Sequence, residues 1–166
     1  MDKAKYRRQK RGILIMKLAE ALIERADLKN KIEMLRMRMI NNAKIQEGTK
    51  PNEEPKSLLA ELDEKLARME YLVKHINKTN ELTKSKDGKT ISEMIAEKDV
   101  LSKKIGILGS YLDSANSTIT RLTHTEIRIL SAFPVAEMQK QVDSLSKTLR
   151  ELDTKIQELN WLTELI

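Results

Sequence analysis

The sequence predicts an all-α protein: an antiparallel bundle of four long helices, in which the third and fourth form an extended, coiled-coil-like hairpin. The main observation is a run of apolar residues near the C-terminus at alternating three- and four-residue steps, a heptad pattern that requires a long apolar partner. The composition agrees, because 34% charged and 3% aromatic residues, with five Gly and three Pro in 166 residues, suit long helices. The heptad residues are Val135, Met138, Val142, Leu145, Leu149, Leu152, Ile156 and Leu159.

The first helix is predicted from about residue 16 to residue 43. Its apolar residues follow helical spacing, except that Arg25 occupies a position where an apolar residue is expected. A second apolar stripe lies on the opposite side, which predicts contacts on both sides, within the chain or with another subunit. The first stripe comprises Leu18, Ala21, Leu28, Ile32, Leu35 and Met39, and the second comprises Ile23, Ala26, Met34 and Met37.

A polar connection of about ten residues precedes the second helix, which is predicted to start near Pro55 because proline is favoured in a first helical turn. As the longest irregular segment, this connection is either a functional loop or a simple spacer. Lys86 to Lys89 contains Gly88 and is predicted to form a turn. The second helix continues the heptad with Leu59, Leu62, Leu66, Met69, Val73 and Ile76.

The third helix is predicted from Ile91 to Leu130 and the fourth over residues 135–166, joined by a tight turn at Ser131 to Pro134. With both helices regular, this hairpin would place Lys98 level with the chain's C-terminus, where a lysine is favoured. Polar residues interrupt the heptads at three positions, where they either fix register or oligomeric state or form a buried charged pocket. These residues are Arg25, Lys98 and Glu126.

The net charge of +6 is concentrated in the first 15 residues, where six basic residues and Asp2 contribute +5 and leave +1 for the remainder. The sequence therefore predicts a basic N-terminal tail (residues 1–15) followed by one helical-bundle domain (residues 16–166). Met16 is itself a possible start, in which case the tail is an extension. An alternative function is therefore the binding of nucleic acid or an anionic membrane, through the tail only. The contacting residues would be Lys3, Lys5, Arg7, Arg8, Lys10 and Arg11.

The residue inventory favours a protein without catalysis. The absence of cysteine excludes disulfides and thiolate metal sites and fits a reducing cytoplasm, and no apolar run approaches the roughly 20 residues of a membrane span. His75 and His124 fall on outer heptad positions without the Glu-x-x-His pattern of a di-iron site. A Gly-x-Ser-x-Gly elbow and a phosphate-binding glycine loop are both missing. We therefore expect no enzymatic activity, cofactor, metal or small-molecule substrate.

Several short segments together resemble the bacterial septicolysin-like family of small helical proteins of uncharacterised role. They are Met16-Lys-Leu-Ala-Glu-Ala-Leu, Glu24-Arg-Ala-Asp-Leu, Gln46-Glu-Gly, Ile76-Asn-Lys-Thr-Asn, Ala96-Glu-Lys-Asp and the ending Leu152-Asp-Thr-Lys-Ile-Gln-Glu-Leu-Asn-Trp. The resemblance covers nearly everything after Met16. It implies a helical fold and, through the family label, a cytolysin as an alternative function, but it supplies no catalytic residues.

The leading hypothesis is a cytoplasmic, self-assembling helical protein that acts through protein–protein contacts. A two-helix hairpin cannot bury a heptad stripe on its own, so the hairpin is expected to pair with that of another subunit, giving a dimer or a higher even-numbered assembly. The final turn adds a second cluster, in which Trp161 is a candidate anchor. The expected interface residues are Ile119, Leu122, Ile129, Val142, Leu145, Trp161, Leu162 and Leu165.

Overall fold

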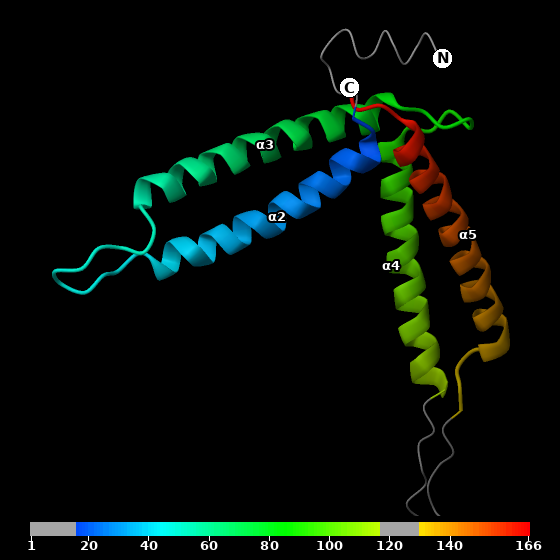
Figure 1. Cartoon of the computed structure of the whole chain (residues 1–166). Helices are drawn as coiled ribbons and strands as arrows, with labels where there is room; N and C mark the ends of the chain where they lie inside the picture. The colour runs from blue at the N-terminus through cyan, green and yellow to red at the C-terminus, as the bar shows by residue number, and fades with distance from the viewer. Residues whose placement is uncertain (1–15, 117–129) are drawn as a thin grey trace, which may run out of the picture. The chain divides into compact units, whose positions relative to one another are not determined.

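The computed structural model of the chain describes residues 16–116 and 130–166 and is all-α within them (Figure 1). Four helices follow one another in the order α2 (Leu18–Asn41), α3 (Pro55–Leu82), α4 (Ile91–Asn116) and α5 (Val135–Leu162). Extended backbone pairing in these ranges is limited to two isolated antiparallel bridges, Lys17 with Glu164 and Lys84 with Thr90. The predicted fold class, four long helices without a sheet, is confirmed.

The packing divides the chain into two compact units. The first runs to Thr90 and also includes the C-terminal residues Leu159–Ile166, whereas the second comprises Ile91–Glu158. The first unit is therefore built around α2 and α3, and the second around α4 and most of α5. Each unit is described by itself below.

In the first unit α2 and α3 lie side by side and run in opposite directions (Figure 1). The predicted core stripe of α2 is correct, because most of its members are buried, and α3 begins at Pro55 as predicted. Asn42 caps the C-terminal end of α2, where the connection begins, because its backbone N–H donates to the carbonyl of Arg38. The buried side chains are Leu18, Ala21, Leu28 and Leu35 of α2 and Leu58, Leu72, Ile76 and Thr79 of α3.

The turn after α3 is a tight one, as predicted. The backbone N–H of Gly88 donates to the carbonyl of Ser85, and the N–H of Ser85 donates to the carbonyl of Lys89. Gly88 has a φ of +83°, a left-handed conformation that glycine adopts without the steric cost of a Cβ. The turn thus reverses the chain before α4 begins at Ile91.

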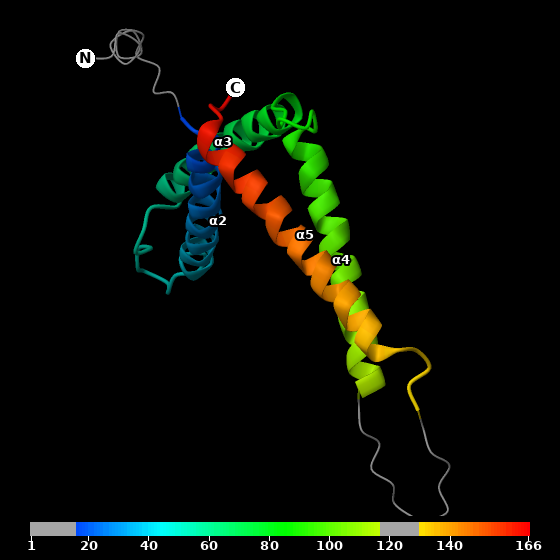
Figure 2. The same cartoon turned by 90° about the vertical axis from the view of Figure 1, so that its right-hand side faces the viewer.

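In the second unit α4 and α5 run in opposite directions (Figure 2). An ion pair joins them, because the Lys98 ammonium of α4 lies 2.5 Å from a carboxylate oxygen of Asp153 of α5. Near the other end of the two helices, the ring of Phe133, just before α5, stacks on the ring of Tyr111 of α4 with 4.3 Å between the ring centroids. These two contacts define the register of the hairpin.

This register corrects the predicted tight turn at residues 131–134. That turn would have placed Lys98 beside Ile166, whereas Lys98 lies on Asp153, nearly four helical turns earlier in the chain. The structure describes α4 only to Asn116, so the expected continuation of this helix to Leu130 falls largely outside the described residues. Heptad spacing does not determine this register, because the same apolar spacing is nearly satisfied when one helix slides along the other by seven residues.

The end of the chain differs from the prediction as well. α5 ends at Leu162, and the last four residues leave the helix to pair with the residues before α2. Leu165 and Ile166 therefore do not share a helical arc with Trp161. The reason is that the chain's last backbone groups find partners at the start of α2, which helical periodicity does not reveal.

Candidate interaction surfaces

The apolar seam of the α4–α5 hairpin is only partly covered by the residues that the structure describes. At the start of α4 the seam residues Ile91 and Met94 are buried, and towards its end Leu112 is buried as well. Between them Leu101, Ile105 and Leu108 are half-buried. In α5 Ile156 is buried, whereas every other apolar heptad residue from Val135 to Leu159 keeps part of its surface exposed. Half-covered apolar surface of this length is typical of an interaction site.

The residues predicted to form an interface fall into three groups. Val142 and Leu145 are half-buried on the α5 seam, in the second unit. Trp161 and Leu162 lie at the end of α5, in the first unit, and are 57% and 65% exposed. Leu165 is half-buried in the extended C-terminal segment. The remaining three, Ile119, Leu122 and Ile129, lie outside the described residues.

The three polar residues that interrupt the heptads have different surroundings. Lys98 has an acidic partner on the facing helix and therefore acts as a register contact within the chain. That partner, Asp153, is one of four polar residues that recur every seven positions in α5, namely Gln139, Ser146, Asp153 and Asn160. Arg25 is half-buried on α2, and Glu126 lies outside the described residues.

The two ends of the described chain are fastened together in the first unit, an arrangement that we call the terminal clasp. The N–H of Leu18 donates to the carbonyl of Thr163 at 3.0 Å, and the N–H of Leu165 donates to the carbonyl of Met16 at 2.9 Å. The Lys17 ammonium donates to the carbonyl of Leu162 at 3.0 Å, which satisfies one of the free carbonyls at the end of α5. These contacts bring together residues separated by nearly the whole chain.

A further bond of the clasp reaches α3. The N–H of Ile166 donates to the hydroxyl oxygen of Thr79 at 2.9 Å, and Thr79 is fully buried. A polar side chain is stable in such a position when it has a hydrogen-bond partner, which the chain's end supplies here. Sequence reasoning missed Thr79, since a threonine near the end of a helix carries no signal of a partner 87 residues away.

One edge of the α2–α3 pair is closed by ion pairs. The guanidinium of Arg68 binds both carboxylate oxygens of Glu24, at 2.7 and 2.8 Å. This bidentate hydrogen bonding holds the pKa of Glu24 below its ordinary value of 4.5, although partial burial opposes the shift, and it raises the pKa of Arg68. Arg68 also lies over the ring of Tyr71, 5.1 Å from its centroid.

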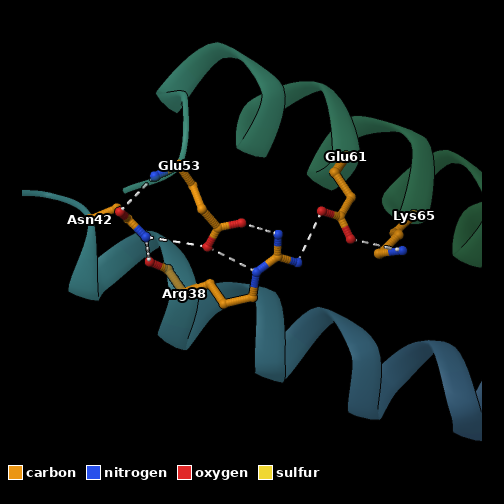
Figure 3. Close-up of polar contacts among 5 residues, drawn as sticks. All are labelled: Arg38, Asn42, Glu53, Glu61 and Lys65. Atoms are coloured by element: carbon orange, nitrogen blue, oxygen red, sulfur yellow. Dashed lines mark hydrogen bonds and ion pairs between the residues drawn. The ribbon is translucent and has the colours of Figure 1, made fainter. Parts of the chain in front are cut away.

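Further along this edge, Arg38 of α2 lies between the carboxylates of Glu53, at the end of the connection, and Glu61 of α3 (Figure 3). It binds both oxygens of Glu53 and also Glu61, which is held in turn by Lys65. Hydrogen bonding to Arg38 lowers the pKa of Glu53, and that to Lys65 is the main cause of the lowered pKa of Glu61. We call the two sets together, Glu24 with Arg68 and Arg38 with Glu53 and Glu61, the ion-pair edge.

The connection between α2 and α3 is held by the same cluster. The side-chain amide of Asn42 donates to Glu53, and the backbone N–H of Glu53 donates to the Asn42 side-chain oxygen at 3.2 Å (Figure 3). The segment that the sequence left open as a functional loop or a spacer is thus tied to the helix pair at both ends. Arg38 and Glu53 were not singled out from the sequence, because charged residues 15 positions apart have no fixed spatial relationship before the fold is known.

The structure also places the first of the two histidines. His75, which falls on an outer heptad position, is half-buried and stacks on Tyr71 with 3.8 Å between the ring centroids. Its Nδ1 contacts the Tyr71 carbonyl oxygen at 2.7 Å. Residues 16–116 and 130–166 contain no cluster of three or more His, Asp or Glu that could hold a metal ion. His124 and the basic residues Lys3 to Arg11 lie outside the described residues.

The helices in the part of the chain that the structure describes are all too polar or too short to cross a lipid bilayer.

Comparison with known proteins gives a family without an assigned role. A family model described as a family of unknown function (DUF6847) matches residues 25–165. The chain belongs to this family. The chain is also similar to the crystal structure of a functionally unknown conserved protein from Corynebacterium diphtheriae, with 36% sequence identity and a TM-score of 0.84. The match covers 92% of this chain and 99% of that protein's chain. A search of curated proteins found no match.

Membership of DUF6847 corrects the resemblance to the septicolysin-like family, which is wrong. The matching family model carries no such label, and neither does the solved relative. The resemblance rested on short polar helical segments such as Ala96-Glu-Lys-Asp, and such segments recur in unrelated helices because solvent-exposed helical faces favour the same few residues.

Proposed function

We propose that this DUF6847 protein is a self-assembling helical protein that acts in the cytoplasm through protein–protein contacts and performs no catalysis. The single observation that carries the proposal is the half-covered heptad seam of α4 and α5. Hydrophobic association favours covering this seam, and the surface best matched to it is the seam of a second copy, because two identical hairpins can close as a four-helix contact with two-fold symmetry.

The middle of the α5 seam is the place where the assembly is most easily tested. Val142 and Leu145 lie close together on the seam, both half-buried, while Lys140 and Lys147 are exposed. A carboxylate at Val142 and Leu145 would bury a charge in an apolar contact, and the desolvation free energy of that charge would break the contact. The same substitution at the two lysines leaves the charge in water.

The proposal is tested by light scattering after size exclusion. The wild-type chain is expected to elute as an oligomer, and the Val142→Asp, Leu145→Asp variant is expected to have a lower mass than the wild type. The Lys140→Asp, Lys147→Asp variant should keep the wild-type mass. Circular dichroism separates loss of assembly from loss of folding. A wild-type chain of 19.1 kDa in solution, or an unchanged mass in the seam variant, would refute the proposal.

Trp161 supplies an independent readout at the other end of α5. It is the chain's one tryptophan and is more than half exposed, as is the neighbouring Leu162. Large aromatic side chains with this exposure are common anchors of protein interfaces. We expect Trp161 fluorescence to shift to shorter wavelength as the protein concentration rises and the chains assemble. Trp161→Ala should lower the affinity of assembly without changing the helix content.

A further inference from the structure

The α2–α3 pair has two edges of opposite character. On one side of the packed positions lie the charged residues of the ion-pair edge. On the other side, at 100° per residue, lie apolar side chains that stay half-buried or exposed, with Leu59 51% and Leu66 46% exposed. We call this strip the leucine edge. It comprises Ile32 and Ile40 of α2 and Leu59, Leu62, Leu66, Met69 and Val73 of α3.

The leucine edge has the pattern of a helix contact that the chain leaves open. Its five residues on α3, from Leu59 to Val73, follow one another at alternating three- and four-residue steps, the spacing of a coiled-coil seam. Yet the described residues cover this seam only in part, since Leu62, Met69 and Val73 are half-buried while Leu59 and Leu66 are exposed. A seam of this kind is complete only when another helix packs on it.

Charges of opposite sign border the leucine edge on its two helices. On α2 the border is basic, with Arg25 and Lys29, and on α3 it is acidic, with Asp63 and Glu70. Within the described residues Arg25, Lys29 and Asp63 form no ion pair or hydrogen bond through their side chains. Among the described residues Glu70 binds only Lys74, on its own helix, and both side chains are exposed. The leucine edge therefore carries basic side chains on its α2 side and acidic side chains on its α3 side.

We propose that the leucine edge binds the leucine edge of a second copy of this chain. A two-fold axis parallel to the helices places α2 of each protomer on α3 of its partner, so that each basic border faces an acidic one. The heights match as well. Within the chain Glu24 is level with Arg68, and the two helices are antiparallel. Lys29 therefore lies at the height of Asp63, and Arg25 lies within one helical turn of the height of Glu70. The same heights hold across the two-fold axis, giving two charge pairs on each side of the interface.

This contact extends the proposed function and rests on it only for the idea that the chain assembles. The leucine edge belongs to the first unit, whereas Val142 and Leu145 belong to the second. Each surface joins two chains independently, so the two together build an assembly larger than a dimer. Loss of either surface alone leaves a dimer held by the other.

Charge exchange between two variants tests the leucine edge. One variant carries Arg25→Glu and Lys29→Glu, and the other carries Asp63→Lys and Glu70→Lys. In a dimer formed by either variant alone, like charges would face each other across the two-fold axis at all four charge pairs. We expect the dissociation constant of the contact to rise about a hundredfold, because each reversed surface pair contributes a few-fold. A one-to-one mixture restores opposite charges at every pair and should regain the wild-type mass, with an affinity that falls as salt is added.

The matched control places the same change of charge away from the leucine edge. Lys50→Glu with Lys78→Glu alters two exposed lysines, one in the connection and one on α3, that make no ion pair with the described residues. This variant is expected to assemble like the wild type. Circular dichroism of all variants should show unchanged helix content, since every substituted side chain except the half-buried Arg25 is exposed.

The outcomes separate this inference from the proposed function. A monomeric Val142→Asp, Leu145→Asp variant with native helix content would overturn the inference, since the leucine edge should still hold it as a dimer. Wild-type mass in both charge variants would overturn it too. If another part of the same chain covered the edge, mixing would restore nothing, which is a third contradicting result. An unchanged mass in the seam variant, together with dissociation of the charge variants, would refute only the proposed α4–α5 contact.

Discussion

Lys98 of α4 binds Asp153 of α5 across the hairpin, with 2.5 Å between the ammonium and a carboxylate oxygen. Both side chains are part-buried, at the border of the apolar seam where a charged pair aligns two helices. Because the two residues are 55 positions apart, one contact fixes which turns of α4 and α5 meet. Removal of this ion pair should therefore loosen the alignment of the hairpin.

The first prediction concerns this pair. Lys98→Met and Asp153→Leu should each lower the free energy of unfolding, and the double variant should lose less than the two together, with a coupling of about 0.5–1 kcal/mol for a pair at this exposure. Exchange of the two charges, Lys98→Asp with Asp153→Lys, should recover part of the loss. Urea denaturation of the wild type, the two single variants and the double variant measures the coupling. Additive losses would show that the contact does not align the hairpin.

The second prediction concerns acid stability through Glu24. Its pKa is lowered in the folded chain by Arg68, so its contribution to stability is present above its ordinary pKa of 4.5 and is lost as the pH falls through the lowered value. Glu24→Gln should therefore destabilise the protein at neutral pH, by about 0.5–1 kcal/mol for a half-exposed bidentate pair. The difference from wild type should shrink below pH 4.5. Glu64→Gln, at an exposed carboxylate of α3, is the control and should show no such dependence.

The third prediction concerns the terminal clasp. Thr79→Val keeps the side-chain shape but removes the oxygen that accepts the Ile166 N–H, and should cost about 0.5–1.5 kcal/mol of stability. Thr79→Ser keeps the hydroxyl and should retain slow hydrogen exchange at Ile166, although it loses a methyl group. Exchange at the amides of Leu18 and Leu165 reports the rest of the clasp. Equal exchange at Ile166 in the valine and serine variants would contradict the role given to Thr79.

The fourth prediction concerns the basic tail. A chain that starts at Met16 should lose all appreciable affinity for DNA, RNA and anionic vesicles, because it loses +5 of the net charge of +6. Shift assays at several salt concentrations compare it with the full chain, whose binding should weaken steeply as salt is added. Equal, salt-sensitive binding by both chains would move the site to the folded part of the protein.

The helices and their order are determined by the sequence itself, since these features are local. Heptad spacing marks the apolar face of each helix, Pro55 begins α3, and Gly88 allows the turn before α4. The half-covered seam of Val142 and Leu145 could be expected on the same basis, because an apolar stripe on a helical hairpin has no second layer to cover it. Local spacing decides which residues can share a face, and for these elements the tertiary structure agrees.

Only the tertiary structure decided which turns of the helices meet. The pairing of Lys98 with Asp153, the clasp bond of Lys17 to Leu162 and the bond of Ile166 to Thr79 join residues that are 55, 145 and 87 positions apart. Heptad spacing is nearly unchanged when one helix slides by seven residues along another, so the sequence pattern is equally satisfied by several registers. Hydrogen bonds and ion pairs are satisfied in one register only, because donor and acceptor must come within about 3 Å of each other. These short-range contacts therefore select a single arrangement.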